Sequence, residues 1–185
     1  MGMYLGDDDT TTQFEAIALP HLDAAYNLAR WLTRNDQDAQ DLVQNAFLRA
    51  FRFRDGYRGG DARAWLMTIV RHTYYTSLRD ARREQADVSF DEELHGADAH
   101  DASVYDIGAD PAHIAAGRDI GTTVNRALES MPAAFREVLV MKEMDDLSYQ
   151  QIAQVAGIPI GTVMSRLARG RKLLLAMLRK EGAGD

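Results

Sequence analysis

Apolar residues recur at helical spacing along most of the chain. Within residues 13–34 they are separated by three or four positions, a spacing typical of an amphipathic helix. Pro20 falls inside this run, so we expect it to interrupt the helix or to begin a second one at its first turn. A further helix is predicted to start after a cap at Asn35 or Asp36 and to carry an apolar stripe as far as Ala50.

A glycine-containing segment at 55–61 ends this pattern and predicts a break. We expect Asp61 to cap the next helix, whose apolar positions run from Ala64 to Tyr74 and lead into the basic sequence at 79–83. The N-terminal part of the chain is therefore predicted to be helical over 13–34, from about 36 to 50 and from about 62 onwards, with Pro20 as an interruption or a helix start within the first of these stretches.

The periodicity disappears at 84–117, a stretch rich in Asp, Ala and Gly that is typical of a linker. From this change we predict a disordered N-terminus at 1–12, a helical domain at 13–90, an acidic linker at 91–117 and a second helical domain at 118–182. Because a polar linker of this length limits only the maximum separation, we expect no fixed relative orientation of the two domains.

Helical spacing returns near Asp119. Further helices are predicted after Ser130, after a cap at Ser148 as far as Ala156, and from Ile160 onwards to about residue 180. No alternating run is long enough to predict a strand. The expected fold class is all-α: two small helical domains joined by a flexible acidic linker, the C-terminal one with a helix-turn-helix.

Composition narrows the function classes. The 185 residues include 46% hydrophobic residues, enough for a packed core, and no cysteine, which excludes disulfides and thiolate metal sites. No apolar run is long enough for a membrane span, and the acidic N-terminus does not resemble a secretory signal, so we expect a soluble, cytoplasmic protein without membrane insertion. The five histidines form no ligand pair, and nucleotide-binding and nucleophile motifs are absent from the sequence, so we expect no enzyme, cofactor or metal.

The net charge of −7 conceals two basic segments separated by an acidic one. Residues 49–83 carry nine basic and three acidic residues, whereas 84–119 carry one and ten. In the C-terminal part, 157–180 has six basic residues and no acidic one. Because the local charge governs binding to a polyanion, the sequence favours nucleic acid as a partner of both basic segments.

The most specific local motif is SYQQIAQVAGIPIGTVMSRL at 148–167. Small Ala153 permits close helix approach, Gly157 permits a positive φ at the turn, and an apolar wedge fills the angle, as a helix-turn-helix requires. The second helix would present Ser165 and several cations to a DNA groove or to phosphates. The alternative interpretation is a helical hairpin with a solvated basic face.

The other basic segment, 49–83, mixes arginines with aromatic residues, as single-strand nucleic-acid sites do. For Trp65 the alternative role is a core residue, since it stands at helical spacing with Ile69. Tyr74 and Tyr75 point in different directions from one helix, so at most one of them is expected in the core.

Three motifs together resemble the extracytoplasmic-function (ECF) sigma factors, the smallest group of bacterial sigma-70-type initiation factors. They are DAQDLVQNAFLRAF at 38–51, YRGGDARAWL at 57–66, and LSYQQIA with GIPIGTVMSRLARGR at 147–171. The resemblance covers about 13–83 and 118–180. It implies a non-catalytic subunit that binds core RNA polymerase through the β′ clamp helices and the β flap, reads the −35 and −10 promoter elements, and melts the −10 region. It also implies control by an anti-sigma factor.

The resemblance carries residue roles onto this chain. The set implied to bind core polymerase is Asp41, Leu42, Gln44, Asn45, Phe47 and Leu48. The set implied to bind the −10 element is Arg63, Trp65, Arg71, His72, Tyr75, Thr76 and Arg79. The set implied to bind the −35 element is Thr162, Met164, Ser165, Arg166, Ala168, Arg169, Arg171 and Lys172.

Some of these roles have alternatives, and so does the overall function. Leu42 and Phe47 are equally consistent with core positions, and His72 with an ordinary surface histidine. The acidic linker is expected either to mimic nucleic acid in a basic polymerase channel or to act as a solvated tether. The alternative function is a stand-alone helix-turn-helix regulator, which leaves 13–83 unexplained.

Overall fold

The computed structural model describes the backbone of residues 7–88 and 120–182, and every regular element within these ranges is helical. The N-terminal domain consists of α1 (Asp7–Ala18), the 3-10 turn η1 (Leu19–His21), α2 (Leu22–Thr33), α3 (Asp36–Arg52), η2 (Arg54–Gly56) and α4 (Ala62–Val88). The C-terminal domain consists of α5 (Ile120–Ser130), α6 (Ala133–Leu139), the π-helical turn η4 (Val140–Met144), α7 (Tyr149–Ala156) and α8 (Ile160–Gly182). The predicted all-α class with two helical domains is confirmed.

Helix bounds differ from the predictions at three places. The first helix begins at Asp7, so residues 7–12 are helical rather than part of a disordered N-terminus. The fourth helix continues to Val88, beyond the basic segment. A π-helical turn follows α6, which no pattern in the sequence predicted. The predicted linker, 91–117, lies outside the described residues.

Local sequence signals explain where the helices of the N-terminal domain start. Pro20 lies in η1 and separates α1 from α2, as predicted. The Asn35 side chain accepts a hydrogen bond of 3.0 Å from the backbone N–H of Asp38 and so caps α3. Asp61 does the same for α4, accepting from the N–H of Ala64 at 2.9 Å.

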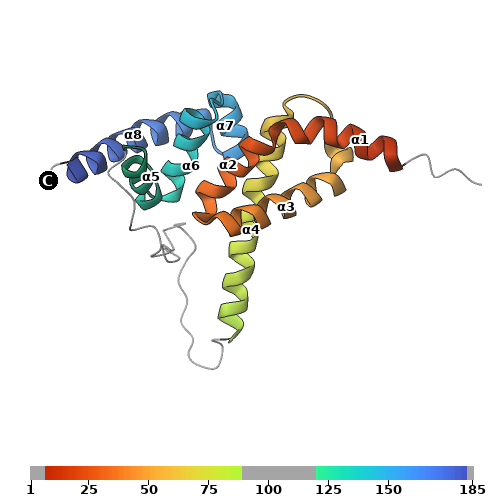
Figure 1. Cartoon of the computed structure of the whole chain (residues 1–185), viewed down its shortest axis with the longest axis horizontal. Coiled ribbons are helices and arrows are strands. Elements are labelled where there is room, and N and C mark those ends of the chain that lie inside the picture. Colours follow the sequence, from red (N-terminus) through yellow and green to blue (C-terminus); the bar gives the residue numbers. More distant parts are fainter. Residues whose placement is uncertain (1–6, 89–119, 183–185) are drawn as a thin grey trace, which may run out of the picture.

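The core of the N-terminal domain lies among α2, α3 and α4. Many of its fully buried positions are alanines, including Ala29 in α2, Ala46 in α3 and Ala64 in α4. Small side chains let the three helix axes approach closely, while Leu28 and Leu66 fill the remaining space. The second half of α4 projects beyond this bundle (Figure 1).

The predicted helix-turn-helix is confirmed in the C-terminal domain. Ser148 and Gln151 form a reciprocal capping box at the start of α7, and Gly157 ends that helix with φ of 65°. The wedge is apolar, since Ile152 and Val163 are fully buried. Gly170 allows close packing of α8 on α6, because a Cβ there would lie 3.1 Å from a methyl carbon of Leu139.

The two domains pack directly against each other. Helix α4 lies against α7, and α2 lies against α6 and η4, so that α7 sits over the N-terminal bundle (Figure 1). The expectation that the domains have no fixed relative orientation is therefore wrong for this structure. Linker composition sets only how far apart two domains can move, whereas complementary side chains on the facing helices determine how they dock.

Candidate polymerase and nucleic-acid interfaces

The carboxylate of Glu137 lies at the centre of the domain interface. Arg71 of α4 forms two bonds with it, from Nε to Oε2 at 3.0 Å and from Nη2 to Oε1 at 3.1 Å. The Tyr75 hydroxyl donates to Oε2 at 3.2 Å, and Arg166 Nη1 of α8 lies 3.7 Å from Oε1. With only 2% of Glu137 exposed, this carboxylate is neutralised by cations from both domains.

Burial shifts the protonation equilibria of this cluster. Desolvation alone would lower the pKa of Arg71, but its hydrogen bonds to Glu137 and the charge of Glu137 more than compensate and raise that pKa. Burial also raises the pKa of Tyr75, and the negative charge of Glu137 adds to this effect. The tyrosine therefore stays neutral and can donate its proton to the carboxylate.

A second acidic residue of the C-terminal domain, Asp145, faces the same surface of the N-terminal domain. Its Oδ1 accepts a hydrogen bond of 3.1 Å from Asn27 Nδ2 and lies 3.8 Å from Arg63 Nη2. Its Oδ2 is buried without a hydrogen-bond partner. Burial raises the pKa of Asp145, while the Asn27 hydrogen bond and the charge of Arg63 oppose that shift.

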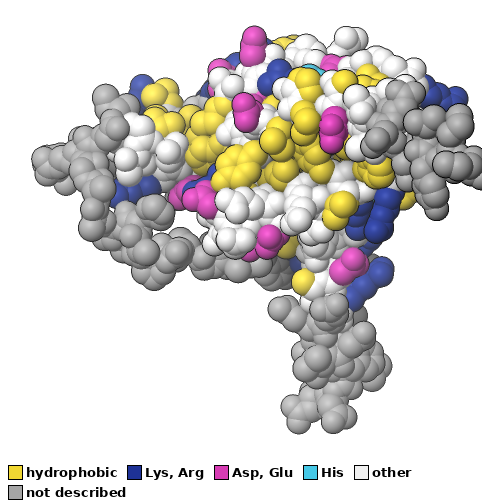
Figure 2. Space-filling model, turned by 45° about the vertical axis from the view of Figure 1, so that its right-hand side comes forward, with side chains coloured by type: hydrophobic (Ala, Val, Ile, Leu, Met, Phe, Trp, Pro, Cys, Tyr) yellow, Lys and Arg dark blue, Asp and Glu magenta, His cyan; other side chains and the backbone are white. Residues whose placement is uncertain are grey.

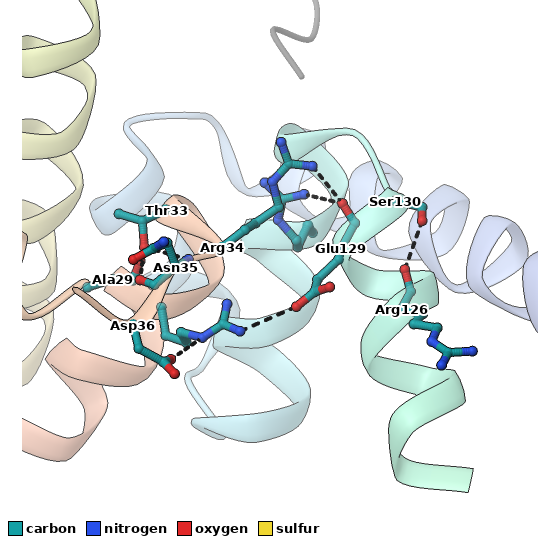
Figure 3. A network of polar contacts seen from close by, with 10 residues as sticks. Ala29, Thr33, Arg34, Asn35, Asp36, Arg126, Glu129 and Ser130 are labelled. Carbon is teal, nitrogen blue, oxygen red and sulfur yellow. Dashed lines mark hydrogen bonds and ion pairs between the residues drawn. The ribbon is translucent and has the colours of Figure 1, made fainter. Parts of the chain in front are cut away.

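Polar contacts continue along both edges of the interface. At the end of α2, Arg34 Nη1 donates to the carbonyl oxygen of Glu129 in α5 at 3.0 Å (Figure 3). Arg30 Nη2 lies 3.4 Å from Oε1 of the same glutamate. At the other edge, Gln151 of the helix-turn-helix donates to the Asp61 side chain that caps α4. These charged and polar pairs lie beside a buried hydrophobic cluster that includes residues of both domains.

The residues predicted to bind the −10 element occupy α4, and they differ in how exposed they are. Arg63, Arg71 and Tyr75 are half-buried and in contact with the C-terminal domain, as described above. Trp65 is partly buried against the core and its ring centroid lies 5.0 Å from that of Tyr57, which supports a structural contribution. Of the remaining members of this set, His72 and Arg79 are exposed, whereas Thr76 is half-buried.

The predicted polymerase-binding set divides between the surface and the core of α3. Asp41, Gln44, Asn45 and Leu48 are exposed, and 54% of Leu48 is accessible. Leu42 is buried and Phe47 packs partly buried against the core, consistent with the core alternative. A band of hydrophobic side chains with basic residues beside it is visible on one face of the molecule (Figure 2).

The predicted −35 face on α8 is open to solvent. Met164, Ser165, Ala168, Arg169, Arg171 and Lys172 are all exposed, and 53% of Met164 is accessible. Arg171 forms an exposed ion pair with Glu143, with 2.6 Å between Nη2 and Oε1. Thr162 and Arg166 are half-buried, and Arg166 points towards Glu137. The six exposed residues lie on one helix and are accessible together.

Sequence reasoning missed the acidic residues that contact the predicted DNA-binding side chains. Glu137 lies in a segment whose other residues are mostly apolar, and this placement was an available signal, whereas Asp145 stands among other charged residues that hide it. Within the described ranges, no group of three His, Asp or Glu side chains is arranged to hold a metal ion. None of the described helices is long and apolar enough to cross a bilayer.

Comparisons with known proteins bear on both domains. Residues 17–84 match the family model of Sigma-70 region 2, and residues 122–174 match that of Sigma-70, region 4. The first match covers the segment that a stand-alone regulator left unexplained. The chain is 32% identical over 146 residues to the ECF RNA polymerase sigma-E factor of Escherichia coli strain K12, covering 74% of this chain and 72% of that protein.

A second relative is the ECF RNA polymerase sigma factor SigE of Mycolicibacterium smegmatis. It is 30% identical over 178 residues, and the match covers 96% of this chain but 66% of that protein, just under two thirds of its length.

Among solved structures, the sigma factor RpoE from Bartonella quintana, crystallised with the anti-sigma factor NepR, superposes with a TM-score of 0.69 and 27% identity, covering 90% of this chain and 97% of that chain. CnrH, in complex with the cytosolic domain of CnrY, has the same fold, with a TM-score of 0.59 and 22% identity, covering 92% of this chain and 90% of that one. On the matches to both sigma regions and to these relatives, the chain belongs to the ECF sigma factors of the sigma-70 family.

Proposed function

We propose that this chain is a promoter-specificity subunit that uses one helix face for each of three contacts. Helix α3 binds the β′ clamp helices of core polymerase, α4 binds and melts the −10 element, and α8 reads the −35 element, while the β flap receives the C-terminal domain. The observation that carries this proposal is the distribution of the three residue sets. Each set lies on a different helix; most of the sets on α3 and α8 are exposed, whereas on α4 His72 and Arg79 are exposed and the other members are half-buried.

The exposed face of α8 has the chemistry of a major-groove reader. Arg169 and Lys172 supply positive charge for guanine edges or phosphates, and Ser165 supplies a hydroxyl group. Met164 and Ala168 lack hydrogen-bonding groups, so they recognise thymine methyl groups or groove shape rather than a donor–acceptor pattern. This combination favours a −35 element read by few hydrogen bonds.

The surface of α4 has the chemistry needed to hold an unstacked strand. Arg71 and Arg79 bind phosphates, and Tyr75 offers an aromatic face on which a base can stack. Flipping a base out of the duplex costs a few kcal/mol, which stacking and contacts to its exposed edge offset. These residues act by binding alone, so the proposed function requires no catalysis by this chain.

The proposed partners follow from the family. The Bartonella relative was crystallised with an anti-sigma factor, and we propose that a protein of that class also controls this chain. The site of action is the cytoplasm, where polymerase and chromosome are found.

Run-off transcription on a fragmented genomic library, with core polymerase alone and with this protein added, tests the proposal. We expect new start sites that share paired upstream elements. Arg169→Ala should reduce transcription from these sites, because Arg169 is exposed on the proposed −35 face. Arg179→Ala is the matched control, since it removes another exposed arginine from the far end of α8. An unchanged set of start sites on adding the protein would contradict the proposal.

A further inference from the structure

Three of the side chains proposed to contact DNA already share one acidic partner inside the protein. Glu137 accepts two hydrogen bonds from Arg71 and one from Tyr75, and it lies within ion-pair distance of Arg166. The first two belong to the proposed −10 set and the third to the proposed −35 set. A single carboxylate of α6 thus connects the DNA-binding residues of both domains.

The geometry of this contact is that of anion recognition. An arginine that binds a carboxylate through two parallel N–H groups uses the same donors with which it binds a phosphate. The Tyr75 hydroxyl donates to the same oxygen pair, so the face of α4 is occupied by an internal anion. Asp145 adds a second acidic contact about two turns away on the same helix, where it lies 3.8 Å from Arg63.

We propose that Glu137 is an autoinhibitory latch, an internal substitute for DNA that holds the two domains together and covers the −10 surface of α4. This inference rests on the proposed role of α4 in promoter binding. Arg71 and Tyr75 cannot bind Glu137 and a DNA strand at the same time. The domains must therefore separate before the −10 element is bound, and the protein alone binds DNA weakly.

The latch leaves the polymerase-binding surface accessible. Asp41, Gln44, Asn45 and Leu48 on α3 are exposed in the docked arrangement, whereas Arg71 and Tyr75 on α4 are half-buried. This difference sets an order of events. Core polymerase binds the closed protein through α3, and promoter DNA binds after the C-terminal domain has moved away from α4.

Charged pairs form one part of the attachment between the domains, beside a hydrophobic cluster that includes residues of both, and this charged part favours opening. Burying charged groups carries a desolvation penalty that their mutual attraction only partly offsets. One interface oxygen, Oδ2 of Asp145, is buried without any hydrogen-bond partner, so part of that penalty stays uncompensated. Removing the charge of Glu137 leaves Arg71 without its anionic partner and shifts the equilibrium towards the open form.

Distance measurements between the domains test the latch directly. The chain has no cysteine, so spin labels can be placed at Gln40→Cys in α3 and Gln154→Cys in α7, both of which are exposed. We expect a narrow distance distribution in the otherwise unchanged protein and a broad one after Glu137→Gln. The matched control is Asp146→Asn, which makes the same chemical change at an exposed residue that pairs with Lys142 inside the C-terminal domain. It should leave the distribution narrow.

Binding of a fluorescein-labelled, mixed-sequence single-stranded oligonucleotide at low salt provides the functional readout. We expect Glu137→Gln to bind the oligonucleotide about tenfold more tightly than the unchanged protein, because a larger fraction of the molecules has the two domains separated. Asp146→Asn should bind as the unchanged protein does. Circular dichroism verifies that both variants keep their helical content.

A reversible cross-link tests the latch without altering Glu137. Arg30 and Glu129 lie on opposite sides of the interface with 3.4 Å between their charged groups, so cysteines at both positions can be joined by a short bismaleimide containing a disulfide. We expect the linked protein to lose oligonucleotide binding and to recover it when a reductant cleaves the linker. The same reductant should not affect the protein carrying the two cysteines without the linker.

Three outcomes would overturn the latch: a broad distance distribution in the unchanged protein, a narrow one in Glu137→Gln, or equal oligonucleotide affinity of the open and linked forms. Failure of the proposed function has a different signature. In that case the library transcription yields no new start sites with any variant, including those that the distance measurement finds open.

Discussion

The two proposed DNA-binding surfaces of this protein have similar residue types but differ in their accessibility. On α8 the exposed set includes Arg169 and Lys172, which are open to solvent. On α4, Arg71 and Tyr75 are bound to Glu137 of the other domain. The difference teaches that the availability of a basic surface depends on the acidic side chains that face it, and not on its own composition alone.

The charge distribution within the C-terminal domain produces this asymmetry. Its acidic residues include Glu137 in α6 and Asp145 just after η4, both directed at the N-terminal domain. The segment 157–180, which carries the proposed −35 face, has none. One domain therefore covers the basic surface of its neighbour, while most of its own proposed −35 face stays exposed.

The largest expected effect comes from destabilising the fold of the C-terminal domain, which carries both the exposed face of α8 and the acidic residues that cover α4. Ile152 is fully buried in the wedge of the helix-turn-helix, so Ile152→Ala should lower the free energy of unfolding of that domain by about 3 kcal/mol. Urea titration followed by circular dichroism should detect this loss. Fluorescence should report the N-terminal domain separately, because both tryptophans of the chain, Trp31 and Trp65, lie there.

The control for this variant is Ile160→Ala, an exposed isoleucine of the same motif, which should change stability by less than about 1 kcal/mol. If Ile160→Ala were as destabilising as Ile152→Ala, the assignment of Ile152 to the wedge would be wrong.

A smaller effect is expected from weakening the contact that covers α4. Tyr75→Phe removes the hydrogen bond to the buried Glu137 carboxylate and should destabilise domain docking by about 1.5 kcal/mol. Inter-domain distances measured by paired spin labels should broaden accordingly.

Tyr57→Phe is the comparison for that measurement, since the Tyr57 hydroxyl donates to Gly60 within the N-terminal domain. Distances that broaden equally in both variants would show that the Tyr75 hydroxyl has no specific part in docking.

The cap at the start of α7 should have a slightly smaller effect, on the stability of the C-terminal domain. Ser148→Ala removes half of the capping box that begins the helix-turn-helix and should lower the stability of the C-terminal domain by about 1 kcal/mol. Thermal unfolding followed by circular dichroism measures the effect. Ser165→Ala, at an exposed position inside α8, serves as reference, and equal losses from the two serines would argue against the capping role.

The smallest effect on stability is expected at the exposed surface of α8. Glu143→Gln breaks an ion pair with Arg171 in which both side chains are about half accessible, so the free energy of unfolding should change by less than about 0.5 kcal/mol. The released arginine should instead strengthen binding to duplex DNA and increase its salt dependence. Fluorescence anisotropy at two salt concentrations tests this, and an unchanged salt dependence would exclude Arg171 from the DNA contact.

Sequence patterns were sufficient for features that depend on neighbours a few residues away. Asp61, Ser148 and Gly157 were predicted as two caps and a turn, and each has that role in the structure. The residue sets on α3 and α8 were implied by the resemblance to ECF sigma factors, and most of their members are exposed. The early start of α1 at Asp7 was not predicted, because its first turn is polar and has no apolar stripe.

The docking of the domains was decided by the tertiary structure. Arg71 and Glu137 are 66 positions apart, and the acidic stretch between them predicted separation rather than contact. Caps and turns follow from hydrogen bonds that close within one helical turn, so the local sequence determines them. A buried ion pair between domains exists only when two complete surfaces meet, and the shapes and charges of those surfaces arise after each domain has folded. The sequence thus determined which helices form and which faces carry charge, and the tertiary structure decided which of those charges remain available to DNA.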